Sequence, residues 1–298
     1  MRLWLSIIGL TLWSLASAPA QVSVEVVPEQ QQFMPGEAMP VAVHIINRSG
    51  QTLHLGTDPL WLTFDVESAD SFIVLKNSEV PVLGAFDLES SQMATKHVDL
   101  QPYFVVTKTG RYTVTATVRI KEWNQAITSA LQTFDIIHGA TLWSQDFGVP
   151  APAGVTNAAP VVRCYSLEEA NYLRSQLRLY VQVSDESGGQ IFKTTAIGPL
   201  VSFSQPEVEL DRSNNLDVLY QSGARLFRFS VVNPQGNIVD EQLYDFFNTR
   251  PRLVVNDRGD VGVVGGVRRP KPSEIPLVKP PNQIPFILPP NQVGTTVQ

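Results

Sequence analysis

The sequence predicts an all-β protein, and three observations lead to this fold class. Short runs in which apolar and polar residues alternate recur along the chain, as in residues 22–27 (VSVEVV) and 111–120 (RYTVTATVRI). Such alternation is typical of strands with one buried face. Turn-forming segments such as Pro35-Gly36 and residues 47–50 (NRSG) separate these runs. Part of the second half also repeats with a period of about 45 residues, which is typical of repeated β-units.

Residues 21–138 form the first predicted domain, an antiparallel β-sandwich. Seven or eight short strands follow one another over about 118 residues, with turn residues every 8–15 positions. A β-hairpin is expected around residues 47–50, because two β-rich runs flank a short turn that contains Gly50. Short strands at regular spacing favour two packed antiparallel sheets.

Two stretches of this domain carry a family resemblance. The segment FMPGEAMPVAVHIINRSGQTLHL (residues 33–55) places a PGE turn before a strand that ends in N-x-S, and TGRYTVTATV (residues 109–118) comes late in the domain. Together they resemble exported bacterial immunoglobulin-like and macroglobulin-like sandwich domains. The resemblance covers only residues 21–138, and it implies a fold rather than an activity.

Residues 139–267 form the second predicted domain, which contains the repeats. Residues 205–221 align without a gap on residues 250–266, so that Pro206 matches Pro251. Each unit is expected to hold four short strands. These strands follow the proline, an Asp/Asn/Gly turn, an Arg-Leu pair and a second glycine turn.

A second alignment, which starts at an Arg-Leu pair in each unit, also supports the repeat. Residues 178–191 align on residues 225–238 with a shift of 47. Pro160 lies 46 residues before Pro206 and is expected to start a third, degenerate copy.

Four strands in 40–50 residues resemble a β-propeller blade. About 130 residues hold fewer than three blades, whereas closed propellers need at least four. The open edges must therefore be covered in one of three ways: by dimerisation, by packing on the first domain, or by folding as a small open meander. A helix is expected over residues 166–177, because Ser166 and Glu169 form a capping box, and it would cover such an edge.

The segment RPRLVVNDRGDVGVVGGVRRP (residues 250–270) combines glycines, aspartates and valines. It lacks the G-x-G-x-x-G spacing and the lysine of phosphate-binding loops. Arg258, Gly259 and Asp260 spell the integrin-binding tripeptide, but the matching turn of the earlier unit reads SNN. The segment is therefore interpreted as a hairpin turn followed by a strand.

Two terminal segments are expected to lie outside the folded domains. Residues 1–20 show the pattern of a secretory signal peptide: Arg2, an apolar stretch of about 13 residues and an A-x-A ending at Ala20. The stretch is too short for a transmembrane anchor, so the sequence predicts an exported, periplasmic or secreted protein. Residues 268–298 contain eight prolines and the repeated PPNQ, which predicts a disordered, proline-rich tail.

The charge argues against nucleic-acid binding. The net charge is −6 for the whole chain and −7 without Arg2. The tail is basic, so residues 21–267 carry about −10. Such a surface repels phosphate, and binders of nucleic acid normally carry a basic stripe.

Metal-binding and nucleophilic motifs are weak in this sequence. His44, His54 and His97 with Asp99 are candidates for a divalent-ion site, but their spacing matches no metal motif. Cys164, the single cysteine, is interpreted as a small buried hydrophobic residue rather than a nucleophile, and it can form no internal disulfide.

Carboxylate pairs are the other candidates for chemistry. Asp211 with Asp217, and Asp257 with Asp260, could be imagined as glycosidase pairs, but both fall on predicted turns. Residues 211–217 (DRSNNLD) resemble a calcium loop, yet the sixth position is not glycine and the twelfth is Ser222. No catalytic, cofactor-binding or metal-binding residue is assigned.

The sequence thus predicts an exported, non-catalytic protein of the cell envelope that binds or scaffolds through the loops and edges of its β-domains. Its partner would be a protein or a glycan, and association of copies through blade edges stays open. The alternative is an envelope hydrolase, or a protease-inhibitor-like module with a loop at residues 58–61. Trp61, Trp123 and Trp143 are expected to pack in the core or between the domains.

Overall fold

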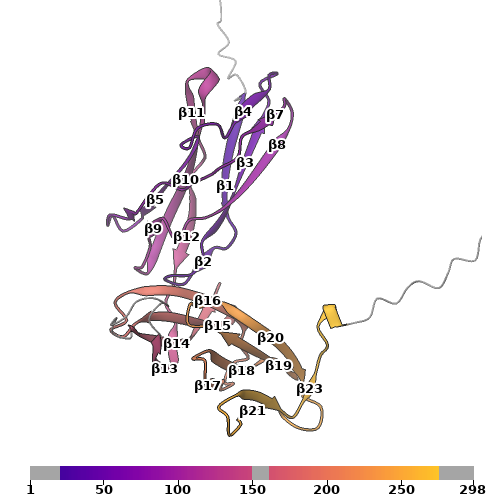
Figure 1. Ribbon diagram of the computed structural model, residues 1–298. Coiled ribbons are helices and arrows are strands. Elements are labelled where there is room, and N and C mark those ends of the chain that lie inside the picture. The colour runs from indigo at the N-terminus through magenta and orange to yellow at the C-terminus, as the bar shows by residue number, and fades with distance from the viewer. Residues whose placement is uncertain (1–20, 150–160, 275–298) are drawn as a thin grey trace, which may run out of the picture.

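The fold was obtained as a computed structural model that describes residues 21–149 and 161–274 (Figure 1). All regular structure in these residues is β, apart from two short 3-10 turns, η1 (Lys121–Trp123) and η2 (Pro272–Glu274). The predicted all-β fold class is therefore confirmed. The strands form two bodies with separate hydrophobic cores, which lie one above the other in Figure 1.

The first body is a sandwich of two sheets. One sheet has the antiparallel order β1-β3-β8. In the other, β10 pairs with β5 on one side and with β11 and β12 on the other, and the short β2 adds parallel to β12. Two small strand pairs, β4-β7 and β6-β9, complete it. The bounds are β1 (Val22–Pro28), β2 (Gln32–Phe33), β3 (Pro40–Asn47), β4 (Leu53–Leu55), β5 (Leu62–Ser68), β6 (Leu75–Lys76), β7 (Phe86–Leu88), β8 (Met93–Asp99), β9 (Phe104–Val105), β10 (Gly110–Ile120), β11 (Gln125–Thr128) and β12 (Gln132–Ile136).

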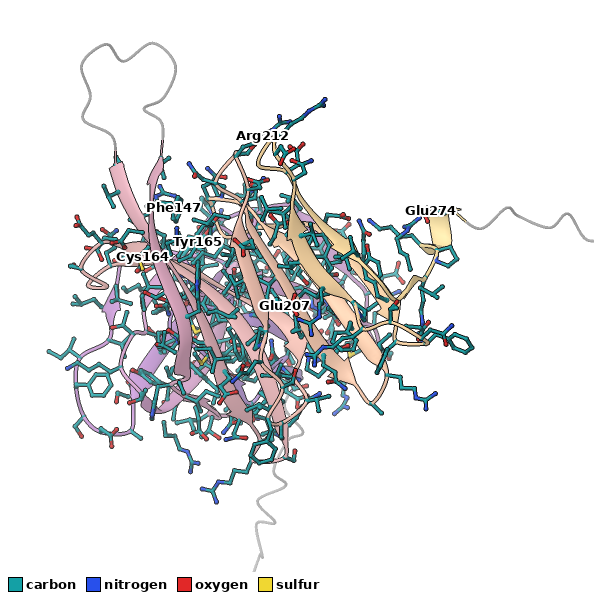
Figure 2. The ribbon with its side chains drawn as sticks, turned by 90° about the horizontal axis from the view of Figure 1, so that it is seen from below. Phe147, Cys164, Tyr165, Glu207, Arg212 and Glu274 are labelled. Atoms are coloured by element: carbon teal, nitrogen blue, oxygen red, sulfur yellow. The ribbon has the colours of Figure 1, made fainter. Side chains whose placement is uncertain are left out.

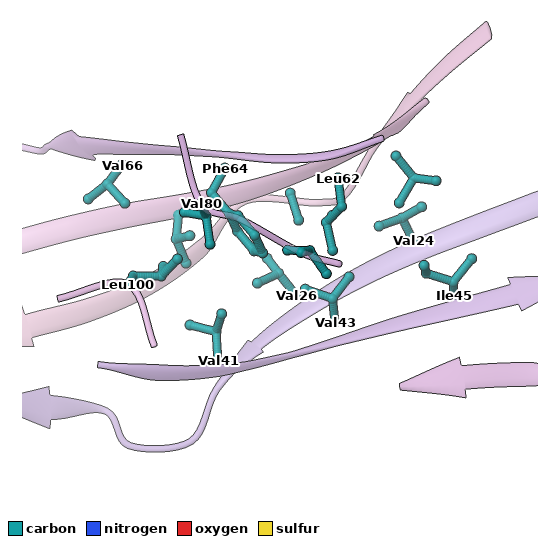
Figure 3. Close-up of a cluster of buried hydrophobic side chains, with 14 of the residues drawn as sticks. Val24, Val26, Val41, Val43, Ile45, Leu62, Phe64, Val66, Val80 and Leu100 are labelled. Carbon is teal, nitrogen blue, oxygen red and sulfur yellow. The ribbon is translucent and has the colours of Figure 1, made fainter. Parts of the chain in front are cut away.

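Alternation along the strands builds the core of this sandwich. Every second residue of β1 points inward: Val24 lies beside Ile45 of the neighbouring β3, and Val26 lies beside Val43. Phe64 of β5 faces them from the other sheet (Figure 3). Trp61 is also buried, and its indole Nε1 donates to the Val82 carbonyl oxygen at 2.8 Å. The hydrophobic period of two seen in the sequence is therefore the period of the buried face.

The second body consists of two antiparallel meanders, one of four strands and one of four strands with the short β23 added, and a hairpin. The first sheet has the order β13-β14-β15-β16, and the second has the order β17-β18-β19-β20-β23. The hairpin pairs β21 with β22 and packs on the outer face of the second sheet through Leu253 and Val263. The bounds are β13 (Ala140–Val149), β14 (Val161–Tyr172), β15 (Gln176–Asp185), β16 (Ile191–Pro199), β17 (Glu207–Leu210), β18 (Leu216–Gly223), β19 (Leu226–Val232), β20 (Ile238–Asp245), β21 (Arg252–Val255), β22 (Val261–Val264) and β23 (Val267–Arg268).

The predicted repeat corresponds to equivalent strands. The 45-residue shift places β17 and β18 over β21 and β22, and the 47-residue shift places β15 over β19. The proposed start of the upstream unit at Pro160 is wrong. Residue 161 begins β14, which holds the second place in its sheet, and the first place belongs to β13.

The turns between equivalent strands are equivalent too. The amide of Asn215 donates to Asp211 Oδ1 at 2.8 Å, and the amide of Asp260, 45 residues later, donates to Asn256 Oδ1 at 3.0 Å. The fourth residue of each turn, Asn214 or Gly259, has a positive φ. These side-chain-capped turns explain why Asp, Asn and Gly recur at this spacing.

The expected helix over residues 166–177 is also wrong, because this segment belongs to β14 and the start of β15. Glu168 is paired with Thr141 of β13 on one side and with Tyr180 of β15 on the other. Strand pairing on both sides satisfies the backbone that the capping box would have satisfied locally. The segment therefore lies inside the sheet and covers no edge.

The two meanders face each other across a shared core. Tyr165 and Leu167 of β14 lie in one hydrophobic cluster with Val218 and Tyr220 of β18. Of the three predicted ways of covering edges, packing on the first body is visible at β16, where Thr194 forms a β-bridge with Glu37. Figure 1 shows β16 lying directly below β2.

The predicted terminal segments lie largely outside the described residues. Residues 1–20 and 275–298 belong there, so the structure does not test the signal peptide or most of the tail. Within the described start of the tail, Arg268 pairs with Tyr244 of β20, and the Arg269 guanidinium contacts Asp245 at 2.6 Å. Among the residues that the structure describes, no helix could span a membrane.

Candidate functional site

The outer strand β13 of the first meander is the candidate interaction edge. It pairs with β14 along its whole length, from Ala140 opposite Glu169 to Val149 opposite Val161. In the part of the chain that the structure describes, no strand pairs with its other side. Trp143 and Phe147 point toward the core, whereas the side chain of Leu142 is exposed.

The β13 edge lacks the usual chemical protection. Natural edge strands are often protected by lysine, proline or a covering segment. The ten residues of β13 contain no lysine, arginine or proline, and Asp146 is the one charged residue among them; a β-bulge lies between Thr141 and Trp143. By contrast, β16 carries Lys193, β8 carries Lys96, and β23 covers one end of β20. Within the described residues β13 is the longest strand at a sheet edge.

An aromatic stack holds β13 in place. The rings of Phe147 and Tyr165 are 4.2 Å apart and nearly parallel, and Figure 2 shows them beside each other. The Tyr165 hydroxyl donates toward the carbonyl oxygens of Asn214 and Val232 in the second meander, each at 3.1 Å. Burial raises the pKa of Tyr165, with a further contribution from Asp211. The edge strand is thus fixed to both sheets through one neutral phenol.

A junction between the two bodies lies at β16, the opposite edge of the same sheet. The amide of Thr194 donates to the Gly36 carbonyl oxygen at 2.9 Å, and its hydroxyl donates to the Pro35 carbonyl oxygen at 2.6 Å. Gly36 has a φ of 76°, and a Cβ atom at this position would lie 2.5 Å from Ile191 Cγ2. The PGE turn therefore serves as a contact between the bodies, and it requires glycine there.

Glu37 ends this turn as a buried carboxyl group. It is only 5% exposed, and its Oε2 accepts the Met34 amide proton at 2.8 Å. Burial raises its pKa to about 7, opposed by the Met34 hydrogen bond and by the charge of Arg178. Burial also raises the pKa of the adjacent Tyr180 to about 12, with the charge of Glu37 as the next cause. The junction therefore contains a carboxyl group that titrates near neutral pH.

A cavity opens beside the junction. It measures about 330 Å³ and is lined by both bodies, with Met39 and Phe104 from the first and Gln190 and Ile191 from the second. Cavities of this size at domain interfaces can hold a small ligand. The lining includes Glu37, and its other side chains are apolar residues, amides and one hydroxyl group, so the cavity brings no second acid–base group to this carboxyl.

The histidines considered as metal ligands have separate partners. His44 Nδ1 is 2.9 Å from Thr95 Oγ1, His54 Nδ1 is 2.6 Å from Asp87 Oδ1, and His97 Nδ1 is 2.9 Å from Glu29 Oε1. Asp99 Oδ1 accepts the amide protons of Met39 and Gln101. Among the residues that the structure describes, no three His, Cys, Asp or Glu side chains come together to hold an ion.

In the Asp211–Asp217 pair, Asp211 has a structural role. Asp211 Oδ1 accepts the amide protons of Ser213 and Asn215, and Oδ2 accepts a proton from the Asn215 side chain. Asp217 is 4% exposed and its Oδ2 has no hydrogen-bond partner. Burial raises its pKa to about 7, with a smaller contribution from the charge of Asp211. Asp211 thus caps a turn, and Asp217 occupies a buried position in β18.

The Asp257–Asp260 segment is also a turn. Asn256 caps it, and the Asp260 carboxylate contacts the Arg212 guanidinium at 3.0 Å. The tripeptide Arg258, Gly259 and Asp260 lies at this hairpin turn, with its carboxylate bound within the chain. These positions match the interpretation of the segment as a turn followed by a strand.

The structure also places the single cysteine, three tryptophans and the loop at residues 58–61. Cys164 is half-buried rather than buried, and its thiol lies 3.7 Å from Ser144 Oγ beside β13. Trp61 lies in the core of the first body, and Trp123 and Trp143 are partly buried against the two cores. The loop at residues 58–61 is a tight turn in which Asp58 Oδ1 accepts the Leu60 amide proton at 2.9 Å.

Two features were missed from the sequence. The sequence repeat did not predict β13 as an edge strand, because the repeat pattern puts the start of its first unit at Pro160. Trp143, Phe147 and Val149 nevertheless show the alternation of a strand. Glu37 was seen only as part of the PGE turn, because its burial comes from strands more than 100 residues away, such as β15 and β16.

Comparison with known proteins adds little to this site. No protein-family model and no curated protein sequence matches the chain. Among solved structures, a crystal structure of Spo0M, a sporulation control protein from Bacillus subtilis, is similar with 11% sequence identity and a TM-score of 0.31, over 68% of this chain and 80% of that one. At this TM-score the likeness establishes neither a shared fold nor a shared function.

Proposed function

We propose that the protein is an exported, non-catalytic binding protein of the cell envelope that takes up an extended segment of a partner protein beside β13. The observation that carries this proposal is the long edge of β13, which contains no lysine, arginine or proline and which the Phe147–Tyr165 stack holds in place. An extended peptide adds to such an edge through main-chain hydrogen bonds, and alternate side chains supply specificity. Export is inferred from residues 1–20.

The architecture supports a more specific family proposal for the first body. The Tyr112 hydroxyl donates to the Lys108 carbonyl oxygen four residues upstream at 2.7 Å, as in the tyrosine corner of immunoglobulin-like domains. We assign residues 21–138 to such a domain. Residues 139–267 would then form a second domain of blade-like repeats, with two complete units and one half unit at β21-β22.

Binding beside β13 is tested by adding charge to the edge. In the double variant Leu142→Lys with Ser144→Lys, two ammonium groups lie along the strand, as in naturally protected edges. The exported form is immobilised and used to capture partners from membrane-free envelope extract of its own cells. We expect at least a tenfold loss of captured protein. Amide hydrogen exchange of β13 should slow in the wild-type complex, because the edge amides become hydrogen-bonded.

The matched control is Met93→Lys with Thr95→Lys on β8. These are alternate exposed positions on an edge strand of the first body. Equal capture by the two double variants would rule out β13 as the binding edge. Unchanged exchange in β13 on complex formation would rule out strand addition even if a partner is captured.

A further inference from the structure

One end of the second body carries exposed aromatic rings on two of its three loops. Because the second meander is antiparallel, the connections that follow β16, β18 and β20 lie at the same end. The first and third of these loops expose Phe203 (104% exposed) and Phe247 (74% exposed), and Phe246 is 38% exposed. We call residues 200–206, 223–225 and 246–252 the aromatic end.

Phe203 also has an unusual backbone conformation. Phe203 has a φ of 64°, a region that residues with side chains rarely adopt. Strained positions of this kind persist where the surroundings impose them, and they concentrate at functional sites. The 45-residue shift places Phe247 over Ser202, one residue before Phe203, so equivalent loops of the two repeat units each expose a phenylalanine.

Arginines without ion pairs surround the rings. Arg225, Arg250 and Arg252 belong to the aromatic end and, within the described residues, none of them contacts a carboxylate. Arg250 lies over the ring of Phe227 at 5.3 Å and lines a hollow together with Phe203 and Gln221.

Two acidic groups lie near this end, and one of them is paired with a cation. Asp245 is paired with Arg269, whereas Glu207 accepts only the neutral Leu253 amide proton at 2.7 Å and keeps its charge. Arg225, Arg250 and Arg252 outnumber this one carboxylate, so the aromatic end is locally basic on a chain whose net charge is −6.

We propose that the aromatic end docks on an anionic phospholipid membrane. Phenylalanine rings on loop tips can enter the interface between headgroups and acyl chains, and the arginines can bind lipid phosphates. A basic patch attracts an anionic leaflet within about one Debye length, so the acidic remainder of the molecule faces away from the membrane. The aromatic end shares no residue with β13.

Vesicle co-sedimentation tests this proposal. The exported form, purified after expression of the whole sequence, is mixed with vesicles of pure phosphatidylcholine or with one third phosphatidylglycerol. We expect binding only to the anionic vesicles, and loss of binding at about 0.5 M salt. Arg225→Gln with Arg250→Gln should weaken the association about 25-fold, at roughly fivefold per arginine. Phe203→Ser with Phe247→Ser should weaken it at least tenfold.

A control variant distinguishes binding through the aromatic end from non-specific binding through other exposed apolar side chains. Ile73 and Leu83 are 86% and 76% exposed on the first body, and Ile73→Ser with Leu83→Ser should leave vesicle binding unchanged. The proposal is overturned if the wild type does not bind anionic vesicles, or if the control lowers binding as much as the loop variants do. Binding of single-stranded DNA in place of vesicles would also overturn it. Thermal unfolding of each variant shows whether it is folded.

Discussion

The hydroxyl of Thr194 on β16 donates to the carbonyl oxygen of Pro35 at 2.6 Å, and so joins two segments 159 residues apart. The Thr194 side chain is almost completely buried, and its Oγ1 also accepts a bond from the Gln182 side chain at 3.2 Å. The backbone bridge between Glu37 and Thr194 lies next to it. This small set of polar contacts connects the PGE turn of the first body to the first meander.

Replacement of Gly36 by alanine should weaken this junction. The new Cβ atom would lie 2.5 Å from Ile191 Cγ2 at a positive φ. Gly50→Ala is the matched control, because Gly50 has a φ of 80° and a Cβ atom added there would have no atom within 4 Å. We expect Gly36→Ala to cost about 1–3 kcal/mol more in urea unfolding than the control. Equal losses would show that the Ile191 contact relaxes without cost.

Stability should fall as pH rises toward neutrality. The pKa of Glu37 rises from 4.5 to about 7 and that of Asp217 from 3.8 to about 7 on folding. The folded state therefore binds more protons than the unfolded state between about pH 4 and 7. Each group stabilises the fold below its unfolded pKa. This contribution, about 3 kcal/mol for Glu37 and about 4 kcal/mol for Asp217, is lost as pH rises from about 4 through 7.

Urea unfolding at pH 5 and pH 8 measures this loss. Glu37→Gln and Asp217→Asn should each reduce the difference in unfolding free energy between the two pH values, and the double variant should reduce it further. A pH difference that neither substitution changes would mean that other groups cause it.

The sequence was sufficient where local chemistry decides the structure. The capped turns at Asp211 and Asn256 were predictable because Asp, Asn and Gly have local backbone preferences, and the strands beside them follow from alternation. The segment at Ser166 failed because its local helix signal competes with pairing to strands on both sides, which is a non-local effect. Burial of Glu37 is non-local as well. A buried carboxyl group at a junction cannot be read from the turn that contains it.

Removal of the Tyr165 hydroxyl should loosen β13. In Tyr165→Phe the ring can still stack on Phe147, but the carbonyl oxygens of Asn214 and Val232 lose their donor. We expect a loss of about 1–3 kcal/mol in unfolding free energy and faster hydrogen exchange along β13. Tyr112→Phe removes a comparable bond in the first body and should leave the exchange of β13 unchanged. If both variants accelerate exchange in β13, the effect is global.

Substitutions at Asp211 distinguish a structural role of this residue from a catalytic or calcium-binding role. Its carboxylate caps a turn through the amides of Ser213 and Asn215, and Asn256 caps the equivalent turn with an amide oxygen. Asp211→Asn should therefore keep most of the stability, whereas Asp211→Ala should lose about 1–2 kcal/mol. Because the charge of Asp211 contributes to the raised pKa of Asp217, Asp211→Asn should also lower that pKa. An asparagine variant as unstable as the alanine variant would show that the negative charge, rather than the turn geometry, is required at this position.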